Sequence, residues 1–111
     1  MQLTLLKGYP DYIGKRFAIC GNGKGPASYV QITTAGGGDP LAVPAFQNYI
    51  DIMFPAKTVS GTYIVYPMPV VVGARSVWRL QWVTASTGAE VAASTNLSAE
   101  SVQLAGLGGV Y

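Results

Sequence analysis

The stretch Ser76-Val77-Trp78-Arg79-Leu80-Gln81-Trp82-Val83-Thr84 decides the fold class of this chain. Trp78, Leu80 and Trp82 occupy every second position, so an extended strand here has one strongly apolar face and one mixed face. No segment carries a sustained apolar repeat of helical period, which makes helix a minor component. We therefore predict a strand over residues 76–84 that places both tryptophans in the core.

Segments on both sides of this strand also have a composition that favours β-strands. Gly and Pro recur at short intervals, and the runs between them are rich in Val, Ile, Thr and aromatic residues, which is typical of short strands joined by turns. A hairpin connection over residues 85–89 leads to a predicted return strand over 90–94, in preference to a helix starting at the capping-box pair Thr87 and Glu90. The other predicted strands cover residues 2–7, 15–20, 29–34, 49–54, 58–66, 69–72 and 101–105.

The predicted fold class is all-β: a jelly-roll or two-sheet β-sandwich of about eight short antiparallel strands. A five-stranded barrel of the oligonucleotide-binding type would leave too many of these strands unplaced. Alternation within residues 49–54 sends three apolar side chains to one face of that strand: Ile50, Ile52 and Phe54. The glycine-rich runs over residues 21–26 and 36–40 predict turns.

A chain of 111 residues is expected to form one domain, residues 1–111, around a single core. Its last six residues, 106–111, are apolar and glycine-rich and carry no charge, which is unusual for a solvated tail. We expect this segment and the apolar N-terminal segment to be docked, either on the chain's own sheet or on a neighbour.

Charge is the unusual feature of the composition. Only 11% of the residues are Asp, Glu, Lys or Arg, whereas an ordinary soluble domain carries about 25%. Half of the residues are hydrophobic and the mean hydropathy is +0.31. Burial of apolar area on association offsets the poor solvation of such a surface, so the composition favours a protein that spends its life packed against neighbours. A merely charge-poor secreted or thermotolerant β domain is the alternative interpretation.

Several partners are disfavoured. The cations are scattered, with only Lys15 and Arg16 adjacent, whereas phosphate-tracking proteins rely on clustered Lys and Arg, so no nucleic acid is expected. The longest charge-free stretch, residues 58–74, has 17 residues and contains Pro67 and Pro69, and a membrane-spanning helix needs about 20. The N-terminus does not resemble a signal peptide, and the single Cys20 can form no internal disulfide, so we expect synthesis and use in a cytoplasm.

Catalysis is not expected either. The chain has no His, which excludes Ser-His and Cys-His nucleophiles and His-containing metal sites, and one Cys excludes thiolate cages. Asp51 lies in mid-strand and is interpreted as an exposed or Arg-paired side chain. The other acids are interpreted as solvated turn residues: Asp11, Asp39, Glu90 and Glu100. The spacing of Gly21, Gly23 and Gly25 matches neither a dinucleotide fingerprint nor a P-loop. We therefore predict no catalytic residue, no metal and no cofactor.

Aromatic residues supply the candidate contacts. Tyr and Trp are favoured at protein interfaces because they combine apolar area with a polar tip, and Arg can bind a neighbour's carboxylate in a two-pronged geometry. Side chains of these types near predicted turns or chain ends are the predicted partner contacts: Tyr9, Tyr12, Arg16, Arg75 and Tyr111.

This short, His-free, charge-poor β chain, ending in the apolar Gly109-Val110-Tyr111, resembles the small capsid accessory proteins of tailed bacteriophages. It is similar in length and texture, over the whole chain, to the jelly-roll cement or "staple" proteins of epsilon15-like phages. The resemblance implies a virion protein on the outer capsid surface that ties neighbouring major capsid subunits together. A pair of copies across a two-fold axis would be an economical symmetric arrangement. No functional residue is carried over from the family, because no discrete motif is shared.

Two other functions compete with this one. A carbohydrate-binding or receptor-binding β-sandwich would present exposed Tyr and Trp platforms with Asn or Asp neighbours, but both tryptophans are assigned to the core face. A small enzyme would need a carboxylate pair, for which Asp51 and Glu90 are the candidates.

Overall fold

The computed structural model describes residues 1–34, 36–43, 50–72 and 75–109. For residues 71, 72, 75 and 76 it describes the backbone only. The described residues contain no helix, and about half of them lie in strands. The strands are β1 (Thr4–Leu5), β2 (Asp11–Ile13), β3 (Arg16–Lys24), β4 (Asp39–Pro40), β5 (Ile50–Met53), β6 (Ala56–Lys57), β7 (Tyr63–Val72), β8 (Arg75–Thr84) and β9 (Ser101–Gly109). The prediction of an all-β, two-sheet antiparallel sandwich is confirmed.

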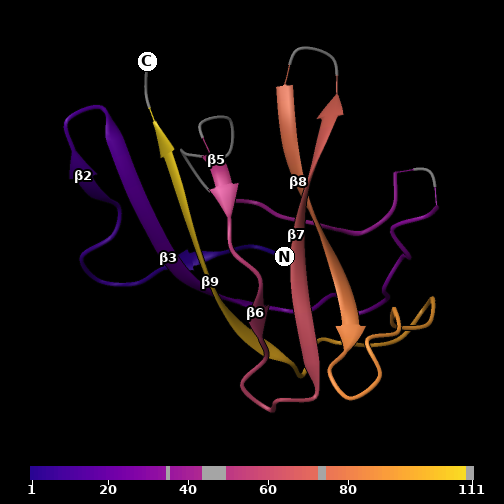
Figure 1. The fold of residues 1–111 in the computed structure, drawn as a ribbon. Coiled ribbons are helices and arrows are strands. Elements are labelled where there is room, and N and C mark those ends of the chain that lie inside the picture. Colours follow the sequence, from indigo (N-terminus) through magenta and orange to yellow (C-terminus); the bar gives the residue numbers. More distant parts are fainter. Residues whose placement is uncertain (35, 44–49, 73–74, 110–111) are drawn as a thin grey trace.

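The strands form two sheets. One has the order β1-β3-β9-β5, with β2 also paired to β3, and the other has the order β4-β8-β7-β6. Figure 1 shows β2, β3 and β9 on one side of the molecule and β7 and β8 on the other, with β5 and β6 between them. Buried side chains from both sheets and their connections fill the interior: Leu3, Phe17, Ile19, Tyr29, Leu41, Val43, Ile50, Met53, Val65, Trp78, Leu80, Trp82, Val91, Leu97, Val102 and Leu104.

Strand β8 forms the centre of this core, as predicted. Trp78, Leu80 and Trp82 are 6%, 0% and 0% exposed. Each indole N–H has a partner: Trp78 Nε1 donates to the carbonyl of Ile50 at 3.3 Å, and Trp82 Nε1 donates to Asp39 at 3.3 Å. Trp78 therefore links the four-stranded sheet to β5 of the other sheet, and Trp82 links β8 to β4 within its own sheet, so neither indole leaves a buried donor unpaired.

Strand β7 is a single strand of 10 residues, whereas the sequence predicted two strands, 58–66 and 69–72, separated at residues 67–68. The two prolines pair with Leu80 and Trp78 of β8. The carbonyl of Trp78 points away from β7, because it accepts from Leu41 on the opposite side. In an antiparallel pair, the backbone N and C=O groups of two opposite residues point either toward each other or away from each other. Pro69 therefore points away from β8 as Trp78 points away from β7, and Pro67, two residues earlier, does the same. Both prolines thus direct their nitrogens to the open edge of β7. The strand therefore continues without losing a ladder hydrogen bond.

The glycine run over residues 21–26 is not a simple turn, because Gly21–Lys24 completes β3, paired with β9 and in part with β1. A Cβ on Gly21 would lie 2.6 Å from the carbonyl oxygen of Thr4, so glycine here permits the close approach of β1. In the run 36–40, by contrast, Gly36 and Gly38 have φ of 69° and 85°, as a turn requires.

Two predicted strands are wrong. Residues 29–34 form turns and irregular structure, because the backbone of Tyr29 pairs with residues 94 and 95 and not with a sheet. Residues 90–94 make only an isolated bridge, Val83 to Glu90, before a turn in which Ser94 has a φ of 66°. Both segments are held by side-chain hydrogen bonds, which β-propensity does not register.

The part of the C-terminal segment that the structure describes lies inside the sheet. Gly106 to Gly109 belong to β9, between β3 and β5. At the other end, Gln2 bridges to Ala42, and the carbonyl of Met1 accepts from the Ala42 amide at 2.8 Å.

Candidate interaction surface

The outer face of the five-stranded sheet is unusually apolar. Burial alternates along β3, where Phe17 and Ile19 face the core and Ala18 and Cys20 face outward. It alternates in the same way along β9, where Leu107 is 46% exposed between two buried glycines.

Register aligns these outward residues into two rows across the sheet. Ala18 lies opposite Leu107, which lies opposite Ile52 of β5. Cys20 lies opposite Ala105, whose carbonyl accepts from the backbone of Phe54 at 3.0 Å. We call these six residues the apolar rows: Ala18, Leu107, Ile52, Cys20, Ala105 and Phe54.

A β-bulge in β5 produces part of this surface. The register shifts between Ile50 and Ile52, so Ile50 and Met53 are buried while Asp51 and Ile52 are both exposed. The prediction that Ile50, Ile52 and Phe54 share one face is therefore wrong for Ile50. One extra residue in a strand reverses the facing of every residue after it.

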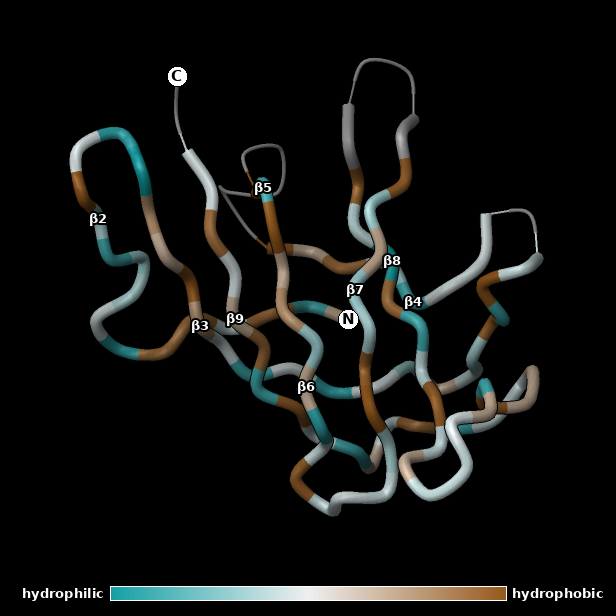
Figure 2. Tube along the Cα trace, in the orientation of Figure 1, coloured by the Kyte–Doolittle hydropathy of each residue, from teal (hydrophilic) through white to brown (hydrophobic). Residues whose placement is uncertain are grey.

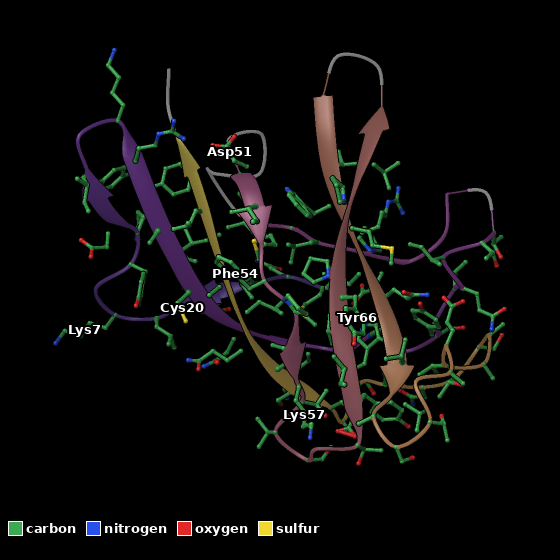
Figure 3. The ribbon with its side chains drawn as sticks, viewed as in Figure 1. Lys7, Cys20, Asp51, Phe54, Lys57 and Tyr66 are labelled. Atoms are coloured by element: carbon green, nitrogen blue, oxygen red, sulfur yellow. The ribbon has the colours of Figure 1, made fainter. Side chains whose placement is uncertain are left out.

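The rows have distinct neighbours at their two ends. Beyond the Cys20 row the outer face becomes polar, with Asn22 opposite Gln103 and Lys24 opposite Ser101. Beyond the Ala18 row, the Arg16 guanidinium lies 3.4 Å from the Asp51 carboxylate. Asp51 is thus both exposed and paired, whereas the sequence left these two as alternatives. Figure 3 shows Cys20 on β3, Asp51 at the start of β5 and Phe54 on the chain leading to β6.

An open hollow of about 260 Å³ lies beside the Ala18 row. Its lining comes from β2, β3 and β9: Asp11, Ile13, Arg16, Phe17, Ala18, Leu107 and Gly108. Its volume lies just below the 300–1,000 Å³ typical of small-molecule sites, and it is large enough to receive a side chain from a partner surface.

The structure brings two of the predicted contact residues together. Tyr12 is 54% exposed and Arg16 has a side chain 66% exposed, and both lie on the β2–β3 hairpin. Tyr9 is 39% exposed and precedes that hairpin. Arg75 begins β8 in the other sheet, and its side chain is not among those described, while Tyr111 lies outside the described residues.

Sequence reasoning missed the apolar residues that dominate this surface. Ile13 is 82% exposed, and Ile52, Phe54 and Leu107 are 44%, 44% and 46% exposed. The one available signal for Leu107 was its place in the charge-free C-terminal segment, between glycines at every second position.

The acids serve the fold in several cases. Asp39 was expected to be a solvated turn residue, but it is 4% exposed and accepts from the Met1 ammonium at 2.6 Å and from Trp82. Burial raises the pKa of Asp39, while the hydrogen bond and the charge of the ammonium act in the opposite direction. A buried charge persists only when it is paired in this way.

Glu90 was also expected to be solvated, but it accepts from the Tyr29 hydroxyl at 2.8 Å and from the backbone N–H of Ile32 at 2.7 Å. The Tyr29 oxygen in turn accepts from the backbone N–H of Trp82 at 3.1 Å. Burial, reinforced by Glu90, raises the pKa of Tyr29 well above its usual range. Glu100 accepts from Ser60 at 2.9 Å. The carboxylates of Glu90 and Glu100 therefore hold loops to the sandwich through these hydrogen bonds.

Within the described ranges, no three His, Cys, Asp or Glu side chains gather as a metal-binding cluster would. In the same part of the chain, no helix has the length and apolarity to cross a membrane.

No protein-family model, no curated protein and no solved structure matches this chain. What the surface does must therefore be inferred from its own shape and chemistry.

Proposed function

We propose that this chain is a non-enzymatic structural protein that binds the outer surface of a viral capsid and clamps neighbouring capsid subunits. The proposed contact is the outer face of the five-stranded sheet, and the partner is the major capsid protein. The protein would then reside on the virion after synthesis in the host cytoplasm. Pairing of two copies across a two-fold axis of the shell is compatible with this role.

The apolar rows are the observation that carries the proposal. Ile52, Phe54 and Leu107 of these rows are exposed and the other three residues are half-buried, on a chain in which only 11% of residues are charged. Contiguous exposed apolar surface of this kind marks protein interaction sites. The flanking polar residues, such as Asn22 and Gln103, match the usual plan of an apolar centre with a polar rim.

The required contact area is modest for a protein of this size. A standard interface covers roughly 800 Å² on each partner, about an eighth of the 6257 Å² exposed by the free chain. A clamp that touches two subunits would cover about a quarter, and the second contact would gain from the high effective concentration created by the first. Weak contacts with each subunit can therefore produce firm attachment to a shell.

The carbohydrate-binding alternative has no tryptophan platform. Trp78 and Trp82 are both buried, so neither offers a flat ring to a sugar. The enzyme alternative is weakened by the acids, because Glu90 is committed to Tyr29 and Ile32, and Asp51 to Arg16.

Binding to capsid shells tests the proposal directly. Decoration-free shells of the virus that encodes the chain would be sedimented with the purified protein, and we expect saturable binding. Leu107→Asp places a charge in the centre of the apolar rows and should abolish binding. Val70→Asp is the matched control, because Val70 is 38% exposed on the other sheet, and it should bind as the unchanged chain does.

Particle stability supplies the second measurement. Particles without this protein should rupture at lower temperature and under milder osmotic shock than complete particles. Equal resistance of the two kinds of particle, or equal binding by the Leu107→Asp and Val70→Asp variants, would contradict the proposal.

A further inference from the structure

The β2–β3 hairpin presents the most exposed apolar side chain of the five-stranded sheet. Ile13 is 82% exposed. A two-residue turn, Gly14 and Lys15, follows it, and Gly14 has a φ of 61°, as the first central residue of a type II′ turn requires. In Figure 2 a hydrophobic segment of this hairpin lies beside a hydrophilic one at its tip.

The hairpin is held in place at its base. Tyr12 pairs with Phe17, and their rings meet edge to face with centroids 6.1 Å apart. Phe17 is 2% exposed, so Tyr12 is fixed to the core. The register pairing and the two-residue turn fix the backbone at Ile13, which lowers the backbone entropy lost when a partner binds.

We propose that this hairpin anchors the protein to its partner: Ile13 enters an apolar pocket on the partner protein, and Lys15 and Arg16 pair with carboxylates at the rim of that pocket. This rests on the proposed function, since it names the chemistry that the partner must offer to the outer face. The hollow beside the Ala18 row, which Ile13 itself lines, receives an apolar side chain of the partner in return.

Charge favours an acidic partner. The strands of the five-stranded sheet and the turns joining β1, β2 and β3 carry four cations, Lys7, Lys15, Arg16 and Lys24, against two acids, Asp11 and Asp51. The Arg16–Asp51 pair is 3.4 Å apart with both side chains about half exposed or more. Such surface pairs are weak, so a partner carboxylate can displace Asp51 from Arg16.

The same charges disfavour a second copy of the chain as the occupant. Two copies meeting through their hairpins would bring Lys7, Lys15 and Arg16 of each together, and like charges across an interface are costly. A lipid surface can also be bound through apolar area with several cations, so the vesicle measurement below separates a membrane from an acidic protein partner.

Ile13→Ser, compared with Val59→Ser, tests the anchor. Val59 is 83% exposed, in the turn between β6 and β7, so the two changes remove equally exposed aliphatic side chains from different ends of the molecule. In titrations against decoration-free capsid shells, Ile13→Ser should weaken binding roughly 10- to 100-fold. Val59→Ser should leave it within about twofold. Lys15→Glu should slow association and flatten its dependence on salt.

Each outcome has a defined meaning. If the unchanged chain binds shells and Ile13→Ser binds as Val59→Ser does, the anchor is refuted while the proposed function stands. If the unchanged chain does not bind shells at all, both are refuted. Ile13-dependent flotation with vesicles of phosphatidylcholine and phosphatidylglycerol would identify a membrane anchor instead. Ile13-dependent self-association in sedimentation velocity would identify a second copy as the occupant, and either result overturns the inference.

Discussion

Replacing Tyr29 by Phe tests how the long connection between β3 and β4 is held to the sandwich. The Tyr29 hydroxyl donates to Glu90 at 2.8 Å and accepts from the backbone N–H of Trp82 at 3.1 Å, and the residue is 1% exposed. Phe fills the same space but leaves the Trp82 N–H without this acceptor. An unsatisfied buried donor costs about 1–3 kcal/mol, and a hydrogen bond to a charged group contributes about 1.5–3 kcal/mol.

The bond to Glu90 and the bond from Trp82 are lost together with one hydroxyl, so their costs do not simply add, and Glu90 keeps its bond from the Ile32 N–H. We therefore expect a loss of about 3 kcal/mol in the free energy of unfolding. For a domain of this size that lowers Tm by roughly 12 °C. Urea unfolding followed by tryptophan fluorescence would measure it. Tyr66→Phe is the control, because Tyr66 is 39% exposed, and it should change stability by less than about 0.5 kcal/mol.

The pH dependence provides a second readout. The pKa of Tyr29 is raised in the folded state by burial. Its contribution is therefore complete below the unfolded pKa of about 10 and declines as the pH rises above that value. The stability difference between the unchanged chain and Tyr29→Phe should shrink above pH ~10. A Tyr29→Phe variant as stable as Tyr66→Phe would refute this account of the connection.

Three further changes test other parts of the fold. Asp39→Asn should destabilise the protein by about 3–5 kcal/mol in urea unfolding, because it leaves the buried Met1 ammonium without its counter-charge; an unchanged midpoint would contradict the pairing. Gly21→Val should cost at least about 1–3 kcal/mol, since its Cβ would lie 2.6 Å from a β1 carbonyl, and thermal unfolding would show it. Replacing Pro67 and Pro69 together by Thr restores two edge N–H groups, so light scattering at high concentration should reveal aggregation that the unchanged chain resists.

Alternation of side chains predicted the core strand but not the limits of its neighbours. Trp78 and Trp82 are buried as the pattern at residues 76–84 required. A break was predicted at residues 67–68, but Pro67 and Pro69 lie in a continuous β7 because their nitrogens face an open edge. Which edge of a strand lacks a neighbouring strand depends on the order of strands in the sheet, and the local sequence does not predict that order.

The candidate surface was predictable in kind but not in detail. Low charge indicated a contact surface, and Tyr12 and Arg16 do lie on the hairpin beside it. Ile52 and Leu107 face outward because of a bulge in one strand and the register between three strands, both long-range properties. Asp39 and Glu90 resembled solvated turn residues because their partners, the Met1 ammonium and Tyr29, are 38 and 61 residues away.

The reactivity of Cys20 tests the central claim most directly. It is the chain's single cysteine, half-buried within the apolar rows and opposite Ala105. The rate of its reaction with a small disulfide reagent would be measured for the free chain and for the chain bound to capsid shells. We predict that the bound thiol reacts at least about tenfold more slowly, because the partner covers this face. An equal rate on chains shown to be shell-bound would mean that another surface makes the contact.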